Sequence, residues 1–67
     1  MDLTARQTQI LKAIIDEYIA SADAVSSETL ERKYSLGISP DTIRNEMAEL
    51  TEKGFLQQLH TSAGRIP

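Results

Sequence analysis

The chain has 67 residues, of which 40% are hydrophobic, and it carries a formal net charge of −3, one histidine and no cysteine. This length predicts one domain, near the smallest size that folds without disulfides or metal, and the missing cysteines exclude a disulfide scaffold and a cysteine-ligated zinc site. No apolar run approaches the roughly 20 residues that span a bilayer, and the N-terminus has no secretion signal, so we expect a cytoplasmic protein without membrane contact.

The first predicted element is a helix over about residues 4–21. Thr4, followed three positions later by Gln7, is typical of a capping box at a helix start. Apolar residues then recur at spacings of three and four, which predicts one buried stripe. The stripe consists of Ile10, Leu11, Ile14, Ile15, Tyr18 and Ile19, and the residues predicted to face solvent are Lys12, Asp16 and Glu17. The pattern stops at residues 21–24, where we expect the first connection.

A second, shorter helix is predicted over about residues 27–35. Ser26 or Ser27 is a suitable N-cap, because a serine hydroxyl accepts a hydrogen bond from a first-turn amide. Gly37 is placed to adopt the left-handed conformation that ends a helix. We expect two residues of this helix to face the first helix, namely Leu30 and Tyr34.

The third helix is predicted over about residues 40–53, with Ser39 as N-cap, Pro40 in the first turn and Gly54 after its end. A narrow apolar seam at spacings of four and three predicts packing on one side only; it consists of Ile43, Met47 and Leu50. The side farthest from this seam carries Asp41, Asn45, Ala48 and Glu52, flanked by Arg44 on one side and by Thr42 and Glu49 on the other.

The last segment, about residues 55–67, predicts a β-hairpin. Apolar and polar residues alternate, pass through a small-residue turn at residues 62–64 and resume at Arg65. Two helices joined by a short glycine-bearing turn indicate a helix-turn-helix, and a hairpin after the last helix is a wing. The predicted fold class is therefore mainly α with a small β-hairpin: a winged helix-turn-helix, made of a three-helix bundle plus a wing, in one domain over residues 1–67.

Charge is distributed unevenly along the chain. Residues 39–52 hold four acids and one base, whereas residues 53–67 hold two bases and no acid. A wing without carboxylates can lie beside a phosphate chain without repulsion. Because the domain as a whole is acidic, we expect modest DNA affinity with a shallow salt dependence.

Catalysis has no visible basis in this sequence. His60 is the only imidazole, there is no thiol, and no glycine-rich phosphate loop is present. A nucleophile would lack a suitable base. We therefore expect no enzymatic activity, no cofactor and no bound metal.

Three stretches carry a resemblance to a known family: "LTARQTQILKAIIDEYI", "AVSSETL" and "SPDTIRNEMAELTEKGFLQQLHTSAGRIP". They closely resemble the N-terminal winged-helix domain of the heat-inducible transcription repressor HrcA family, over nearly the whole chain. The resemblance implies a bacterial, nucleoid-associated dimeric repressor that binds an inverted repeat in double-stranded DNA upstream of chaperone operons. It also implies assistance by a GroEL-type chaperonin, and C-terminal dimerisation and regulatory regions that are absent from these 67 residues.

Three groups of residues are predicted to contact DNA. Residues of the third helix enter the major groove, where arginine pairs with guanine and asparagine with adenine; they are Thr42, Arg44 and Asn45. Serines at helix N-termini hold backbone phosphates; they are Ser26, Ser27 and Ser39. The wing follows the backbone or the minor groove, through His60, Thr61, Ser62, Gly64 and Arg65.

Some of these residues also have structural interpretations. Arg44 can instead pair with Glu28 or Glu31 of the preceding helix, and Asn45 can be a solvated surface residue. Three acids at three-residue spacing are expected to face water rather than a metal; they are Glu46, Glu49 and Glu52. We expect Met47 to be core, and Tyr34 to be core with its hydroxyl at the surface.

Two alternative functions stay open at this stage. The "S-x-x-TIR" start of the third helix also resembles sugar-responsive regulators of the DeoR type, although those tend to have a second arginine after TIR and a glycine-rich wing. The net charge of −3 also suits an acidic winged helix that binds proteins and not nucleic acid. Salt-sensitive binding to duplex DNA separates that alternative from the repressor.

Overall fold

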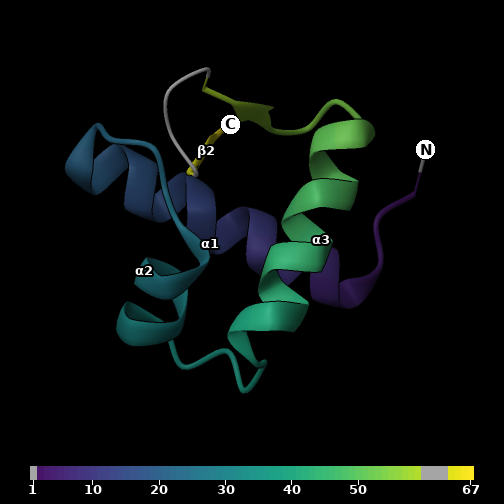
Figure 1. Ribbon diagram of the computed structural model, residues 1–67, viewed down its shortest axis with the longest axis horizontal. Coiled ribbons are helices and arrows are strands. Elements are labelled where there is room, and N and C mark those ends of the chain that lie inside the picture. Colours follow the sequence, from purple (N-terminus) through teal and green to yellow (C-terminus); the bar gives the residue numbers. More distant parts are fainter. Residues whose placement is uncertain (1, 60–63) are drawn as a thin grey trace.

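The computed structural model describes residues 2–59 and 64–67. Within them the elements follow in the order α1 (Ala5–Ser21), α2 (Ser27–Lys33), α3 (Pro40–Glu52), β1 (Gln57–Gln58) and β2 (Arg65–Ile66). The two strands pair antiparallel, with Gln57 opposite Ile66 and Gln58 opposite Arg65. Three helices followed by a small hairpin sheet confirm the predicted winged helix-turn-helix (Figure 1).

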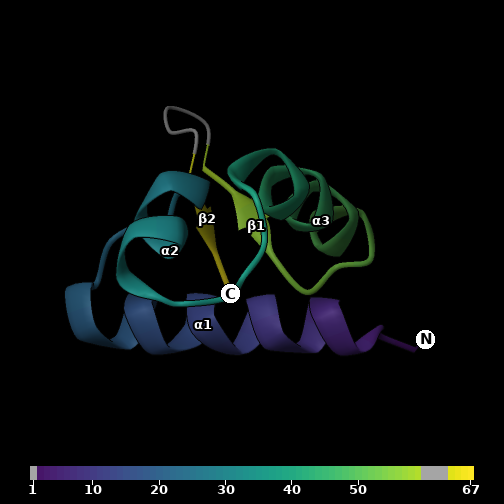
Figure 2. The same cartoon turned by 90° about the horizontal axis from the view of Figure 1, so that it is seen from below.

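α1 forms one layer of the molecule, and α2, α3 and the strands lie over it in a second layer (Figure 2). The sheet is fastened to the α1–α2 connection by two backbone hydrogen bonds. Val25 N donates to Arg65 O at 2.8 Å, and Arg65 N donates to Val25 O at 2.9 Å. β2 also contacts α1, and in Figure 2 the end of the chain after β2 lies over the middle of that helix.

The core lies between the two layers and draws on every helix. α3 contributes the apolar seam that the sequence predicts, including Met47, which is only 2% exposed. Burial of each large apolar side chain contributes about 1.5–3 kcal/mol. The buried hydrophobic residues are Ile10, Ala13, Ile14, Val25, Leu30, Ile43, Met47, Leu50 and Leu56.

Local signals set most helix ends. The capping box at α1 is confirmed, since Gln7 N donates to Thr4 Oγ1 at 3.0 Å and Thr4 N donates to Gln7 Oε1 at 3.1 Å. Ser39 caps α3 as predicted. After α3, Gly54 has a φ of +90°, and the amides of Gly54 and Phe55 donate to carbonyls of the last turns. A left-handed glycine therefore closes α3, because it lets the chain reverse over the helix end.

α2 ends two residues earlier than the sequence suggests, at Lys33 and not near residue 35. Tyr34 is already extended, with a φ of −124°, and its hydroxyl donates to Glu17 Oε1 at 3.3 Å. Gly37 does adopt a φ of +69°, but it shapes the turn into α3 and does not cap α2. Desolvation, followed by the neighbouring Glu17 carboxylate, raises the pKa of the Tyr34 hydroxyl.

The buried face of α1 is rotated from the predicted stripe. Glu17, predicted to face solvent, is buried, while Ile15 and Ile19 are 36% and 76% exposed. Glu17 is stabilised in this position by Lys33, whose Nζ lies 3.0 Å from Glu17 Oε2. Ala13 also joins the core, because α2 and α3 pack against the side of α1 that carries Ala13 and Glu17.

Candidate nucleic-acid interface

A shallow depression of about 230 Å³ opens between α2, α3 and the two strands. It brings together three residues that the sequence predicts as DNA contacts, one from each of these parts: Ser27, Arg44 and Arg65. Sequence reasoning did not assign the other lining residues to the site; they are Glu28, Met47 and Gln58. Gln58 lies opposite Arg65 in the strand register, so it could have been found only with the hairpin register known.

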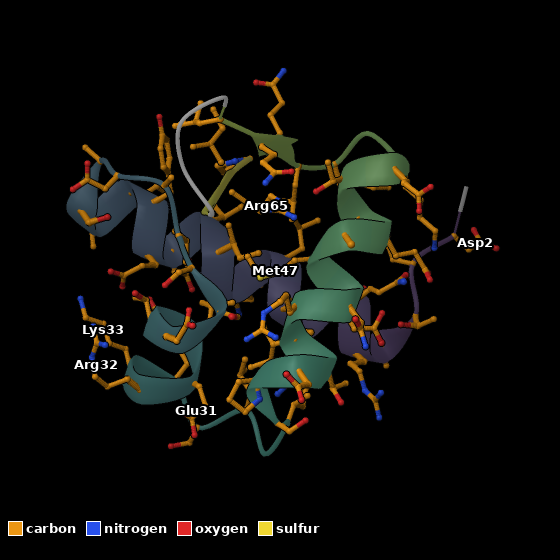
Figure 3. All side chains as sticks on the ribbon, viewed as in Figure 1. Asp2, Glu31, Arg32, Lys33, Met47 and Arg65 are labelled. Carbon is orange, nitrogen blue, oxygen red and sulfur yellow. The ribbon has the colours of Figure 1, made fainter. Side chains whose placement is uncertain are left out.

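Arg65 lies at the base of the hairpin. Its Nε donates to Thr51 Oγ1 at 3.0 Å, and Thr51 Oγ1 in turn donates to Met47 O at 2.8 Å. Figure 3 shows Arg65 and Met47 near the centre of the view, between α3 and the strands. The half-buried Arg65 side chain therefore connects β2 to α3, and its predicted contact with DNA stays a prediction.

Arg44 lies on the exposed surface of α3, with 56% of its side chain accessible. Its Nη1 lies 2.8 Å from Asp41 Oδ1, one turn earlier on the same helix. Arg44 therefore pairs with Asp41 and not with Glu28 or Glu31, the two partners that the sequence left open. Glu31 lies at the outer edge of α2 (Figure 3). Asn45 is exposed beside Arg44. Both residues predicted to read bases are thus accessible, Arg44 on the flank toward α2 and Asn45 on the side farthest from the buried seam.

The hydroxyls of Ser26 and Ser39 are occupied within the protein. Each accepts the amide three residues later, from Thr29 at 3.1 Å and from Thr42 at 3.3 Å. Each also donates to the hydroxyl of that same threonine at 3.0 Å. Ser27 is 5% exposed. A phosphate at these helix starts would therefore depend on backbone amides more than on the serine hydroxyls.

Gly64 is buried against the α1–α2 connection. A Cβ built on Gly64 would lie 2.9 Å from Ala24 Cβ, 3.0 Å from Ala24 C and 3.1 Å from Val25 N. These distances are shorter than van der Waals contact, so the glycine is required for the close approach of the two segments. The other predicted wing contacts, His60, Thr61 and Ser62, lie outside the described residues.

Of the three acids of α3 that are predicted to face water, Glu49 and Glu52 are exposed, whereas Glu46 is half-buried. Glu46 accepts a hydrogen bond from Gln7 Nε2 at 3.2 Å and lies 3.6 Å from Arg6 Nη1. Glu49 also accepts from Gln7 Nε2, and its Oε2 lies 3.3 Å from Lys53 Nζ. The hydrogen bond from Gln7 and then the contacts with Lys53 lower the pKa of Glu49. These two carboxylates therefore bind α1 and the end of α3 instead of facing the outward side.

Neither a metal-binding cluster nor a membrane-spanning helix is found in the part of the chain that the structure describes. No group of three or more His, Cys, Asp or Glu side chains there is placed to hold a metal ion. No helix in residues 2–59 is both long and apolar enough to cross a membrane.

Comparison with known proteins identifies relatives of the whole chain. A family model described as a DeoR-like helix-turn-helix domain matches residues 6–66. Three similar proteins each carry the name heat-inducible transcription repressor HrcA. The chain is 63% identical to the protein of Desulforudis audaxviator over all 67 residues. It is 60% identical to that of Symbiobacterium thermophilum over 62 residues, and 58% identical to that of Desulforamulus reducens over 67 residues.

The match covers only a part of each relative. It spans 100%, 92% and 100% of this chain but 20%, 18% and 19% of these three proteins. A crystal structure described only as that of a hypothetical protein superposes on 97% of this chain and 21% of its own, with a TM-score of 0.93 and 43% sequence identity. The resemblance to HrcA proteins that the sequence motifs indicate is confirmed, and the chain corresponds to about a fifth of such a protein.

Proposed function

The chain belongs to the family of DeoR-like helix-turn-helix domains. From this domain and from the HrcA relatives we propose that it is the sequence-specific DNA-binding domain of a bacterial heat-inducible transcription repressor. Its relatives over the whole chain are transcription repressors, which are not enzymes. Since the chain spans about a fifth of those relatives, repression by the whole protein is part of the proposal. So is the assignment of dimerisation and regulation to regions beyond residues 1–67.

The main support is the outward side of α3. An α-helix fits the major groove of B-DNA, and arginine and asparagine each form bidentate pairs there, with guanine and with adenine. Arg44 and Asn45 are neighbours in sequence, both exposed, on the helix that follows the helix-turn-helix turn. Thr42 is half-buried, and at about 100° per residue it lies on the flank of α3 opposite Arg44, one turn before Asn45 and Glu46. We assign base reading to these three residues, with Arg44 as the principal contact.

The ion pair between Arg44 and Asp41 is compatible with this role. Both side chains are exposed, at 56% and 86%, and exposed ion pairs contribute only about 0–1 kcal/mol. Arg44 can therefore leave Asp41 at little cost when a guanine offers two acceptors. Until then, Asp41 holds the guanidinium over the outward side of the helix.

Backbone contacts are assigned to the elements around the depression. The helix starts at Ser26, Ser27 and Ser39 present first-turn amides, and a helix N-terminus favours an anion. Arg65 and Gln58 line the depression on the wing side. The predicted wing contacts of residues 60–62 and 64 complete the set. Phosphate contacts of this kind set register and do not read sequence.

Further elements of the proposal follow from the resemblance to HrcA. They are an inverted-repeat operator upstream of chaperone operons, a homodimer formed through other regions, a GroEL-type chaperonin partner, and a location on the nucleoid in the bacterial cytoplasm. One domain covers one half-site of such a repeat. Affinity should therefore rise steeply when two copies are tethered, because the second binding event becomes intramolecular.

Fluorescence anisotropy tests the function. The 67-residue chain, alone and as a tethered pair, is titrated into a labelled duplex carrying a chaperone-operon inverted repeat and into a scrambled duplex, each at two salt concentrations. We expect tighter binding to the repeat and weaker binding at higher salt. Equal, salt-insensitive or absent binding to both duplexes would contradict the proposal and favour the acidic protein-interaction module, which the net charge of −3 supports.

The matched domain model is that of DeoR-like proteins, so a metabolic regulator of the DeoR type is the second candidate. The same titration distinguishes it when a duplex from a sugar operon is added as a third probe. Preference for the sugar-operon duplex over the chaperone repeat would favour the DeoR type.

A further inference from the structure

A buried amide links α1 to α3. The Gln7 side chain is 1% exposed, and both of its polar atoms are fully used. Its Oε1 accepts from Thr4 N at 3.1 Å and from Lys53 Nζ at 3.0 Å. Its Nε2 donates to Glu46 Oε1 at 3.2 Å and to Glu49 Oε2. A single side chain in the first turn of α1 therefore binds three side chains near the C-terminal half of α3 and beyond its end.

The partners of Gln7 lie along one stripe of α3. Glu46, Glu49 and Lys53 are separated by three and four residues, so at about 100° per residue they share one side of the helix. By the same geometry, Arg44 lies on roughly the opposite side. Any rotation of α3 about its axis that loosens this stripe would also turn Arg44, because one rigid helix carries both.

We infer that Gln7 is a positioning residue for DNA recognition: by binding Glu46 and Glu49 it fixes the rotation of α3 and holds both carboxylates on the side of the helix opposite Arg44. The inference rests on the proposed function. It also accounts for two of the four acids of α3, since the charges of Glu46 and Glu49 are bound by Gln7, Arg6 and Lys53 on the side of the helix opposite Arg44.

Only an amide suits this position. The site requires one oxygen that accepts from Thr4 N and from Lys53 Nζ, and one group that donates to the carboxylates of Glu46 and Glu49. The side-chain amide of glutamine supplies the acceptor and the donor. Glutamate would still accept from Thr4 N, so it would preserve the capping box. It would have no donor for Glu46 and Glu49, and would repel them. The two roles of Gln7, in capping α1 and in holding α3, are therefore separable by one substitution.

The test compares Gln7→Glu with a matched control, Gln9→Glu. Gln9 is exposed on the same helix, so its variant adds the same charge without entering the network. Binding is measured by anisotropy on the repeat and scrambled duplexes, at temperatures where circular dichroism shows every variant folded. We expect Gln7→Glu to bind the repeat about tenfold more weakly than Gln9→Glu, a difference of about 1.4 kcal/mol.

A rescue variant separates positioning from general stability. In the double variant Gln7→Glu with Glu49→Gln, the carboxylate and the amide exchange places. The amide introduced on α3 then donates to the carboxylate introduced on α1, which still accepts from Lys53 Nζ and Thr4 N. We expect the double variant to bind the repeat more tightly than Gln7→Glu, although less tightly than the wild type, because Glu46 still faces the carboxylate at position 7 without receiving a hydrogen bond from it. If Gln7→Glu binds like Gln9→Glu, or if the double variant regains stability without regaining affinity, Gln7 has only a structural role and the inference is overturned.

NMR residual dipolar couplings measure the orientation of α3 relative to α1 without DNA. We expect the couplings of α3 to change in Gln7→Glu and to return in the double variant; unchanged couplings would overturn the inference. If the wild-type chain binds neither duplex, the proposed function fails, and these couplings still decide whether Gln7 sets the rotation. Should Gln7→Glu not fold, Lys53→Met removes a donor to the same network and is expected to shift the same couplings.

Discussion

The two flanks of α3 are built in different ways. On the flank toward α1, Gln7 binds Glu46 and Glu49, and Lys53 closes the network. On the flank toward α2 and the strands, Arg44 is exposed beside a depression, and Arg65 reaches from the sheet to α3 through its hydrogen bond with Thr51.

This difference bears on the proposed role of α3, because it separates the acids of the helix into two groups. Glu46 and Glu49 on one flank bind side chains of α1. Asp41 and Glu52 are exposed on the remaining surface with Arg44 and Asn45, and Asp41 pairs with Arg44. Counting charges along the chain, by contrast, treats all four acids of residues 39–52 as equally unfavourable for DNA. What matters is which side of the helix each acid occupies, and which groups already bind it.

The largest effect is expected at the wing side, from Gly64→Ala. The new Cβ would lie 2.9–3.1 Å from Ala24 and Val25 atoms, and overpacking of this kind costs about 1–3 kcal/mol. Urea unfolding measures the loss of folding free energy. Ala24→Gly in the same chain removes the nearest atom and should recover part of it. An unchanged midpoint for Gly64→Ala would show that the sheet is not held closely against the α1–α2 connection.

Arg44→Ala tests the outward side. We expect it to cost about 1–3 kcal/mol in binding to the repeat and to relax sequence preference, while unfolding free energy changes by less than about 0.5 kcal/mol because the residue is exposed. Arg32→Ala, an exposed arginine at the outer edge of α2 (Figure 3), is the control. Equal loss on repeat and scrambled duplexes would assign Arg44 to backbone binding.

Thr51→Val tests the link between the sheet and α3. Valine keeps the shape but removes the oxygen that accepts from Arg65 Nε and donates to Met47 O. Loss of one such half-buried hydrogen-bonded group costs about 0.5–1.5 kcal/mol. Amide exchange should accelerate in β2 more than in α1. Thr8→Val, exposed on α1, is the control; equal effects from both variants would contradict a specific link.

The smallest effect concerns pH and the flank toward α1. The folded-state pKa of Glu49 is lowered by Gln7 and then Lys53, so its contribution to stability is present above the ordinary pKa of 4.5 and is lost as pH falls below it. Urea midpoints of wild type and Glu49→Gln should therefore converge between about pH 6 and about pH 3. Glu52→Gln controls for removing one charge. If the difference between the two urea midpoints stays constant across this range, the Glu49 carboxylate does not stabilise the fold through Gln7 and Lys53.

The sequence predicted the parts of this protein that depend on neighbours in the chain. The capping box at Thr4, the serine N-cap and glycine end of α3, the seam of Ile43, Met47 and Leu50, and the order of helices and hairpin all follow from spacings of a few residues. The family resemblance rests on the same kind of signal, since motifs are local. Base reading by Arg44 and Asn45 remains a prediction of this kind.

Tertiary packing decided the rest. Apolar residues cover a wide arc of α1, and only the positions of α2 and α3 determine that Ala13 and Glu17 are buried while Ile19 is exposed. Likewise, the partners of Gln7 on α3 and just after its end lie 39 to 46 residues away, and the clash that requires Gly64 comes from Ala24 and Val25. Contacts between distant segments depend on the relative placement of whole elements, so local spacing carries no record of them.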